Sequence, residues 1–243
     1  MASVMWDAEL AAVYDNVYAR EAEPSVVGPI ARVLAELAGG GGAVEFAVGT
    51  GRIALALSAR GVAVTGIELS PHMAERLRAK SGAQAVPVIV GDMATTRAEG
   101  SFTLVYVVAN SIMNLTTQDE QLAVFGNAAA HLGPGGRFVV SVIVPQPRAV
   151  PAGGKGRVFT LDPDHVGIET FDDPVGQIAW SHHWMEVGGR LVRHSAPYRY
   201  VWPSELDLMA RLAGFRLEHR WAGWDRSVFT ADSAHHVTVY EKI

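Results

Sequence analysis

The chain has 243 residues, of which 49% are hydrophobic, so it has enough apolar material for the core of one large α/β domain. It contains no cysteine, which excludes disulfides, thiolate metal sites and a cysteine nucleophile. A net charge of −5 does not favour nucleic acid, and neither a signal peptide nor an apolar run of the roughly 20 residues that span a membrane is evident. We therefore expect a cytoplasmic protein with a small-molecule partner and with no nucleic-acid or membrane partner. The sequence leaves open whether its oligomeric state is a monomer or a homodimer.

The first 42 residues are predicted to be helical. Residues 6–20 place apolar side chains at intervals of three and four, which is the spacing of an amphipathic helix. A second helix is expected to begin near Pro24 and to end at the glycine run 39–42, because glycine terminates helices. We interpret 1–42 as an N-terminal helical cap.

Strands and helices alternate from residue 43 to residue 144. The strands are short runs of β-branched and apolar residues, as in strands that are buried on both faces. The predicted strands are 43–48, 62–68, 86–90, 102–109 and 137–144, and the predicted helices between them are 51–60, one that begins after Ser70, and 117–132. This alternation predicts an α/β fold with a doubly wound parallel sheet.

The segment 145–201 interrupts this pattern. Its first part, 145–156, is rich in proline and glycine and is expected to form a loop or hinge, and 157–201 is predicted to form antiparallel strands. The elements predicted after it are a helix at 202–214 and strands at 216–222 and 236–241. We interpret 145–201 as an inserted antiparallel β lid on a core made of 43–144 and 202–243.

Within the lid, Gly188-Gly189 is the expected two-residue turn of a hairpin. Such a turn sets the register, because the strand pairs are counted outward from it. Since side chains alternate between faces, His182 shares a face with Trp180 and Trp184, and His183 lies on the other face. The predicted opposite pairs are Val187 with Arg190, His183 with His194, and His182 with Ser195.

A glycine turn, Gly49-Thr50-Gly51, follows the first predicted strand and marks a ligand site at the carboxyl end of the sheet. Together with Ala54 it fits the dinucleotide fingerprint, and Glu68 lies where an acidic residue holds ribose hydroxyls, so an NAD(P)-dependent oxidoreductase is one candidate. Glu45 argues against this candidate, because a dinucleotide domain has an apolar residue at that point of the strand. Asp92, at the end of the third strand, is available to an adenine amino group.

Four motifs follow one another with consistent spacing. They are Glu45-Phe46-Ala47-Val48-Gly49-Thr50-Gly51, Ile67-Glu68-Leu69-Ser70-Pro71-His72-Met73, Gly91-Asp92-Met93 and Leu132-Gly133-Pro134-Gly135-Gly136-Arg137-Phe138. In this order they resemble the motifs of the class I S-adenosylmethionine-dependent methyltransferases. The resemblance covers about residues 30–145, and it departs from the family at Ala47, where the family usually has glycine.

The resemblance implies a Rossmann-like seven-stranded sheet whose last strand is antiparallel, and an enzyme whose cofactor is S-adenosylmethionine. Methyl transfer would be a direct in-line displacement by an O, N or C nucleophile of a small molecule. The acceptor could be aromatic and secondary-metabolite-like, since the motif of enzymes that methylate nucleic-acid amino groups is absent after the fourth strand. A non-catalytic protein that binds the same cofactor is a further alternative.

The resemblance also implies roles for residues around the cofactor. Glu45 would order the glycine turn, Glu68 would accept hydrogen bonds from the ribose hydroxyls, and Asp92 would accept one from the adenine amino group. The other expected cofactor contacts are Tyr14, Ala47, Gly49, Gly51, Leu69, Met73, the backbone of Met93, Val108 and Asn110.

Five residues are candidates for a general base, namely His182, His183, Tyr14, Tyr18 and Glu21. Histidine titrates near neutral pH and can take up a proton and pass it on. His182 is preferred, because the two tryptophans on its face form a wall suited to an aromatic or cationic acceptor, although it could also be a packing residue. No metal is expected, because no cluster with the spacing of metal ligands follows the fourth or fifth strand.

Overall fold

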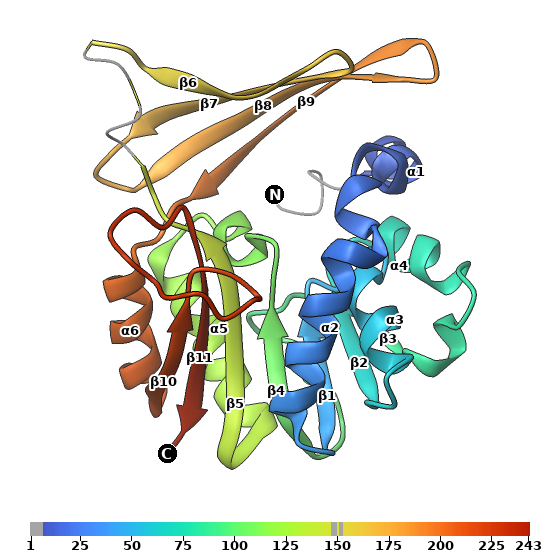
Figure 1. Cartoon of the computed structure of the whole chain (residues 1–243), viewed down its shortest axis with the longest axis vertical. Coiled ribbons are helices and arrows are strands. Elements are labelled where there is room, and N and C mark those ends of the chain that lie inside the picture. Colours follow the sequence, from blue (N-terminus) through green and yellow to red (C-terminus); the bar gives the residue numbers. More distant parts are fainter. Residues whose placement is uncertain (1–6, 147–149, 151–152) are drawn as a thin grey trace.

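The strands form two separate sheets in a computed structural model of the chain (Figure 1). The structure describes residues 7–146, 150 and 153–243. A seven-stranded sheet forms the core, and a four-stranded sheet lies across its upper end in the view of Figure 1. No helix within the described ranges is long and apolar enough to cross a bilayer.

Two helices precede the core sheet. The first, α1 (Ala8–Val17), begins at Asp7, whose carboxylate accepts a hydrogen bond from the Leu10 N–H at 2.9 Å. The 3-10 turn η2 (Arg20–Ala22) then leads to α2 (Pro24–Ala38), which ends at Gly39 with a φ of 57°. Both predicted helices are confirmed, although the first ends before residue 20 and its predicted start at residue 6 lies outside the described residues.

The core sheet confirms the predicted seven-stranded architecture. Its strands are β1 (Gly42–Phe46), β2 (Val64–Glu68), β3 (Val88–Val90), β4 (Phe102–Val107), β5 (Leu132–Ile143), β10 (Phe215–Trp221) and β11 (His235–Lys242). They are ordered β10-β11-β5-β4-β1-β2-β3. The last strand, β11, pairs antiparallel with both of its neighbours, and the pairings among β1 to β5 are parallel.

Helices connect these strands across both faces of the sheet. They are α3 (Arg52–Ser58), α4 (Pro71–Arg78), η3 (Ala83–Ala85), η4 (Ser111–Asn114), α5 (Gln118–His131) and α6 (Pro203–Leu212). Ser70 caps α4, since its hydroxyl accepts a hydrogen bond from the Met73 N–H at 3.3 Å. β5 begins at Leu132 and not at the predicted residue 137, because Leu132, just before the glycine-rich stretch, already pairs with Phe102 of β4.

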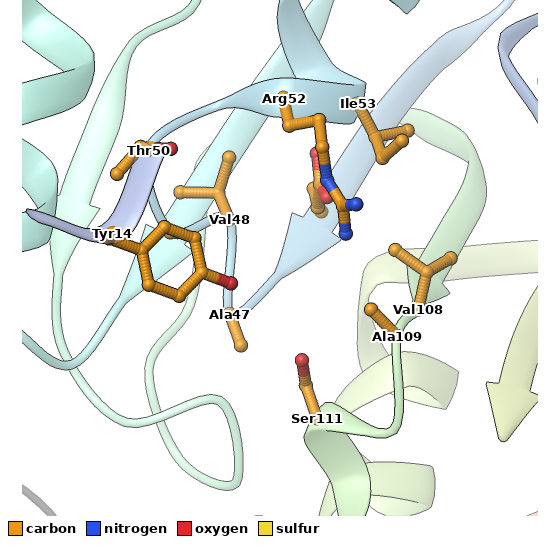
Figure 2. Close-up of a pocket in the computed structure, with 11 residues that line it drawn as sticks. Tyr14, Ala47, Val48, Thr50, Arg52, Ile53, Val108, Ala109 and Ser111 are labelled. Atoms are coloured by element: carbon orange, nitrogen blue, oxygen red, sulfur yellow. The ribbon is translucent and has the colours of Figure 1, made fainter. Parts of the chain in front are cut away.

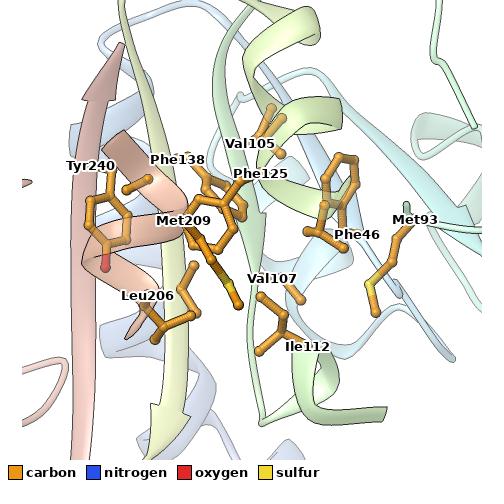
Figure 3. Close-up of a cluster of buried hydrophobic side chains, with 14 of the residues drawn as sticks. Phe46, Met93, Val105, Val107, Ile112, Phe125, Phe138, Leu206, Met209 and Tyr240 are labelled. Atoms are coloured by element: carbon orange, nitrogen blue, oxygen red, sulfur yellow. The ribbon is translucent and has the colours of Figure 1, made fainter. Parts of the chain in front are cut away.

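One apolar cluster fills each face of the core sheet. The cluster toward α5 and α6 contains Phe46, Phe125, Phe138 and Tyr240 (Figure 3). The Phe125 and Phe138 rings meet edge to face, with centroids 5.0 Å apart. The second cluster packs against α2 and α3. Burial on both faces explains why the strands of this sheet carry nearly continuous apolar runs.

The four-stranded sheet, which we call the lid sheet, contains β6 (Gly156–Asp162), β7 (His165–Asp173), β8 (Ile178–Val187) and β9 (Arg190–Arg199). All of its pairings are antiparallel. The β8–β9 hairpin turns at Gly188-Gly189 and pairs His183 with His194 and His182 with Ser195, which confirms the predicted register. The loop expected at 145–156 lies partly outside the described residues.

One face of the lid sheet is packed toward the core, and we call it the inner face. Residues directly opposite each other on paired strands share a face, so Glu169, Ser181 and His183 lie together with Ala179 and Met185. Glu169, Ala179 and Met185 are buried, and Ala179 belongs to the first apolar cluster. The side chains of the outer face include Trp180, His182 and Trp184.

A buried ion pair anchors the base of the lid sheet. Arg199, at the end of β9, is only 4% exposed and donates to the Glu205 carboxylate of α6 at 2.6 Å. It also donates to the side-chain oxygens of Gln121 at 2.6 Å and Gln177 at 3.0 Å. This network joins β9 to α5 and α6, so the position of the lid sheet over the core is held by side chains of the core itself.

Candidate active site

A pocket opens at the carboxyl ends of β1 and β4, beside the glycine turn (Figure 2). It encloses about 350 Å³ of space, including its open mouth. Figure 2 shows the Tyr14 ring above Ala47 and the Arg52 side chain directed from the glycine turn toward Val108. The lining residues are Tyr14, Glu45, Ala47, Val48, Gly49, Thr50, Arg52, Ile53, Val108, Ala109 and Ser111.

The backbone turns sharply where both strands end. Ala47 and Ala109 each have a φ of 54°, and Gly51 has a φ of 82°. This left-handed conformation costs an L-residue about 1–2 kcal/mol and costs glycine nothing. A Cβ on Gly51 would lie 2.6 Å from Leu77 Cγ, so glycine is required there. The alanine at position 47, where the family usually has glycine, is therefore a strained residue in the pocket wall.

Glu45 places a buried carboxyl group in the same wall, with only 3% of the residue exposed. Its Oε2 accepts a hydrogen bond from the Tyr106 hydroxyl at 2.9 Å. Burial raises the pKa of Glu45 to about 8, although the Tyr106 hydrogen bond and the charge of Arg52 act in the opposite direction. The group is therefore largely neutral at pH 7, and a positive charge entering the pocket would ionise it.

Glu68 lies directly behind the glycine turn. Its carboxylate accepts hydrogen bonds from the backbone N–H groups of Gly49 and Ser70, both at 2.8 Å. Burial raises the pKa of Glu68, and the N–H groups of Ser70, Gly49 and Leu69 oppose this effect. Since a carboxylate has about four acceptor positions, at least one remains for a ribose hydroxyl. The structure thus brings Glu68 to the glycine turn, and its ribose contact stays a prediction.

The third motif forms a tight loop after β3. The Ala94 N–H donates to Asp92 Oδ1 at 2.8 Å, and the Thr96 N–H donates to the Asp92 carbonyl at 2.8 Å. Gly91 packs so closely on Thr96 that a Cβ there would lie 2.2 Å from the Thr96 hydroxyl. Leu69 is half-buried and Met93 is buried. Met73 reaches the glycine turn, since its Cε would lie 3.7 Å from a Cβ on Gly49.

The helix α1 is tied to the glycine turn and closes one side of the pocket. Asp15 accepts hydrogen bonds from the Thr50 hydroxyl at 2.6 Å and from Lys80 Nζ at 2.9 Å. Burial acts to raise the pKa of Asp15, but these two partners outweigh it and the pKa is lowered. Tyr14 lines the pocket and its ring centroid lies 4.6 Å from that of Tyr18. Burial raises the pKa of both phenols, so each keeps its proton at neutral pH.

Arg52 adds a positive charge to the pocket, and its Nη1 donates to the carbonyl oxygen of Glu21 at 2.9 Å. The Glu21 residue is exposed, so the structure does not bring its carboxylate into the pocket. Asn110 accepts a hydrogen bond from the Ile143 N–H at 2.8 Å and thereby joins the ends of β4 and β5. The residues near the glycine turn that the sequence analysis did not single out are Asp15, Thr50, Arg52, Ile53, Ala109 and Ser111. The available signal was the position of Thr50 within the first motif and of Arg52 directly after it.

His183 lies on the inner face of the lid sheet within a chain of hydrogen-bonding groups. Its Nε2 is 2.7 Å from the Ser181 hydroxyl, and its Nδ1 is 2.8 Å from Nε2 of His165. Burial, followed by the positive charges that His165 and His194 can carry, lowers the pKa of His183 to about 4. The imidazole is therefore neutral over the physiological range and can accept a hydrogen bond.

His182 lies on the outer face. It stacks on Trp180 with ring planes 8° apart, neighbours Trp184, and has its Nδ1 2.9 Å from the Ser195 hydroxyl. The aromatic wall that favoured His182 as the base thus lies on the outer face, and the structure does not bring His182 toward the pocket. Alternation along a strand tells which residues share a face, but the packing of Ala179 decides which face is turned inward.

Comparison with known proteins identifies relatives of this chain. Residues 43–136 match a family described as "Methyltransferase domain". The chain is 25% identical over 202 residues to the cypemycin N-terminal methyltransferase of a Streptomyces species, covering 82% of each chain. It superimposes on the CcbJ methyltransferase of Streptomyces caelestis with a TM-score of 0.79 and 33% identity, covering 89% of each chain. The fold is also that of S-adenosylmethionine-bound CalS10, an amino pentose methyltransferase of Micromonospora echinaspora (TM-score 0.70, 19% identity, 95% of this chain and 97% of that one).

Proposed function

The chain belongs to the class I S-adenosylmethionine-dependent methyltransferases of small-molecule type, and from this we propose that it methylates an amine nitrogen of a natural product with His183 as the base. It is an enzyme, and its cofactor is S-adenosylmethionine. When bound, this cofactor supplies a methyl group on a positively charged sulfur. The nicotinamide and non-catalytic alternatives are set aside with this assignment.

The residues around the pocket fit this cofactor. Gly49 leaves room for a ligand against the main chain, and the buried Glu45 gains from a nearby positive charge because it is then able to ionise. We propose that Glu68 holds the ribose hydroxyls, since it keeps acceptor capacity at the glycine turn. The remaining proposed contacts are Tyr14, Ala47, Gly51 and Val108 toward the methionine end, and Leu69, Met73, Asp92 and Met93 toward the adenine.

The inner face of the lid sheet supports an acceptor position over the mouth of the pocket. α1, which carries Tyr14, contacts β8, and η4, which carries Ser111, contacts β9. Tyr14 and Ser111 both line the pocket, so the lid sheet contacts elements on two sides of the pocket. Ser181 and His183 lie on the inner face of β8, the strand that α1 contacts. An acceptor held there would have its nucleophile between His183 and the pocket.

The hydrogen-bonded groups Ser181, His183 and His165 on the inner face offer a path for a proton that leaves the acceptor. An amine with a pKa near that of lysine, about 10, arrives as an ammonium ion, which has no free electron pair. His183 can accept its proton at Nε2 when the acceptor N–H replaces the Ser181 hydroxyl, and the Nδ1 proton can then pass to His165. His165 releases a proton to solvent in turn. The acceptor nitrogen keeps the electron pair that forms the new N–C bond.

The observation that carries this proposal is the position of His183 on the inner face of the lid sheet, between the Ser181 hydroxyl at 2.7 Å and His165 Nε2 at 2.8 Å. The choice of nitrogen is supported by the cypemycin relative, whose name gives an N-terminal amine as its acceptor.

The test compares His183→Gln with His182→Gln, a matched control on the same strand and the opposite face. Turnover is measured as transfer of a labelled methyl group from the cofactor to a panel of amines and phenols. For the amines it should fall by about 100-fold in His183→Gln, which is within the usual range for loss of a general base. The deficit should shrink as the pH approaches the pKa of the amine, because the neutral amine then needs no base. His182→Gln should retain turnover.

Equal losses in the two variants, or a His183→Gln deficit that does not change with pH, would remove His183 from the chemistry. Methylation of phenols in the panel, with no methylation of amines, would instead reject nitrogen as the acceptor atom and leave the family assignment intact.

A further inference from the structure

We propose that Asn127 of α5 is a positioning residue for the adenine end of the cofactor. It holds the Met93–Ala94 peptide, and this peptide fixes the orientation of the Asp92 carboxylate. The inference rests on the proposed function, because it takes Asp92 and Met93 as the adenine contacts. Asn127 has no part in the proposed proton path, yet it is a polar side chain on the buried face of α5, with 2% of the residue exposed.

The Met93–Ala94 peptide is held at both of its polar atoms. Asn127 Nδ2 donates to the Met93 carbonyl at 2.7 Å, and the Ala94 N–H of the same peptide donates to Asp92 Oδ1 at 2.8 Å. A peptide is planar and its C=O and N–H point in opposite directions, so fixing the carbonyl also fixes the direction of the N–H. Asn127 therefore sets the orientation of the Asp92 carboxylate without touching it.

The rest of the loop is attached to the same turn of α5. Asn127 Nδ2 also donates to the Thr96 carbonyl at 2.9 Å, and Arg97 Nη1 donates to the Asn127 carbonyl at 2.9 Å. The Ala98 N–H donates to His131 Nε2 at 2.9 Å, so His131 carries its proton on Nδ1 and donates it to the Asn127 carbonyl at 2.8 Å. These bonds leave the loop after β3 little freedom to move relative to α5.

The arrangement is not explained by packing alone. Asn127 Oδ1 is buried and has no hydrogen-bond partner among the described residues. An unpaired buried acceptor is unfavourable, so packing by itself would favour an apolar side chain here. The flipped amide is excluded, because its oxygen would then face the carbonyl oxygens of Met93 and Thr96. Compared with an apolar side chain, the Asn127 amide contributes two hydrogen bonds to the loop that carries Asp92.

The test uses S-adenosylhomocysteine and S-inosylhomocysteine, in which a carbonyl oxygen replaces the 6-amino group of the purine and N1 carries a proton, so that both contacts proposed for Asp92 and the Met93 backbone are changed. By calorimetry on the full chain, the wild-type protein should prefer the adenosine compound by about 10–100-fold, because the inosine compound loses a hydrogen bond to a charged acceptor. In Asn127→Ala, S-adenosylhomocysteine should bind about tenfold more weakly, and the preference should fall to a few-fold.

Gln121→Ala is the matched control. Gln121 is another buried amide of α5, but it donates to the carbonyls of Ile112, Leu115 and Arg199, away from this loop. The Gln121→Ala variant should have a lower Tm and an unchanged preference for the adenosine compound over the inosine compound. Should Asn127→Ala not fold, His131→Leu removes the neighbouring attachment at Ala98 and should reduce the preference in the same direction.

Three results would overturn the inference. An Asn127→Ala protein with the full wild-type preference would remove the positioning role. An equal loss of preference in Gln121→Ala would reduce the effect to general destabilisation. A wild-type protein that binds both compounds equally would remove the adenine subsite and the inference with it, while amine methylation could still be measured as the separate test of the proposed function.

Discussion

Glu45→Gln should stabilise the ligand-free protein at neutral pH. Glu45 is 3% exposed, and its carboxyl group accepts a hydrogen bond from the Tyr106 hydroxyl. Glutamine keeps an oxygen for that hydrogen bond and has the same size, but it carries no charge that burial can penalise. The substitution therefore isolates the free-energy cost of keeping this one group protonated in the folded chain at a pH at which the unfolded chain ionises it.

The magnitude follows from the pKa of Glu45, which burial raises from an ordinary 4.5 to about 8. Below pH 4.5 the group is protonated in both the folded and the unfolded chain, and it has no effect on stability. As the pH rises, the unfolded chain ionises first and is favoured, and the loss of folded stability is complete above pH 8. At pH 7 the loss is on the order of 3 kcal/mol, which corresponds to about 6–10 °C in Tm for a chain of this length.

The assay is thermal unfolding of the wild type and Glu45→Gln without cofactor from pH 5 to pH 8, with Glu75→Gln on the exposed surface of α4 as the control. The Tm advantage of Glu45→Gln should grow with pH, and Glu75→Gln should show none. An advantage that is constant over this range would refute the argument that Glu45 is neutral in the folded, ligand-free protein. S-adenosylmethionine should also lose more affinity than uncharged S-adenosylhomocysteine in Glu45→Gln, because the variant offers no carboxylate to the sulfonium.

Two further predictions concern the pocket wall. Ala47→Gly removes the cost of a left-handed alanine, about 1–2 kcal/mol, and adds about 0.5–1 kcal/mol of conformational entropy to the unfolded chain. The free energy of unfolding, measured in urea, should therefore rise slightly. A clear loss of stability would contradict the strain at this residue. Asp15→Ala removes the bonds to Thr50 and Lys80 that hold α1. It should weaken S-adenosylhomocysteine binding by about three- to tenfold and speed tryptic cleavage at the exposed Arg20, and unchanged values for both would show that α1 is held by other contacts.

Local patterns in the sequence determined much of the architecture. Short apolar strands between helices specify a doubly wound sheet, because strands buried on both faces must be apolar throughout. The Gly188-Gly189 turn specified the pairing of His183 with His194, since a two-residue turn leaves one register. The glycine turn and the acidic residues Glu68 and Asp92 marked the ligand end of the sheet, because parallel strands bring their carboxyl ends to the same edge.

The tertiary structure alone decided which of these groups face one another. His182 and His183 are equivalent in the sequence pattern, and only the packing of Ala179 against the core turns His183 inward. Likewise, the bond from Asp15 to Thr50 spans 35 residues and the bond from Asn127 to Met93 spans 34. No local periodicity encodes such contacts, because they depend on how the helices α1 and α5 pack on the finished sheet, and that is settled by burial over the whole chain.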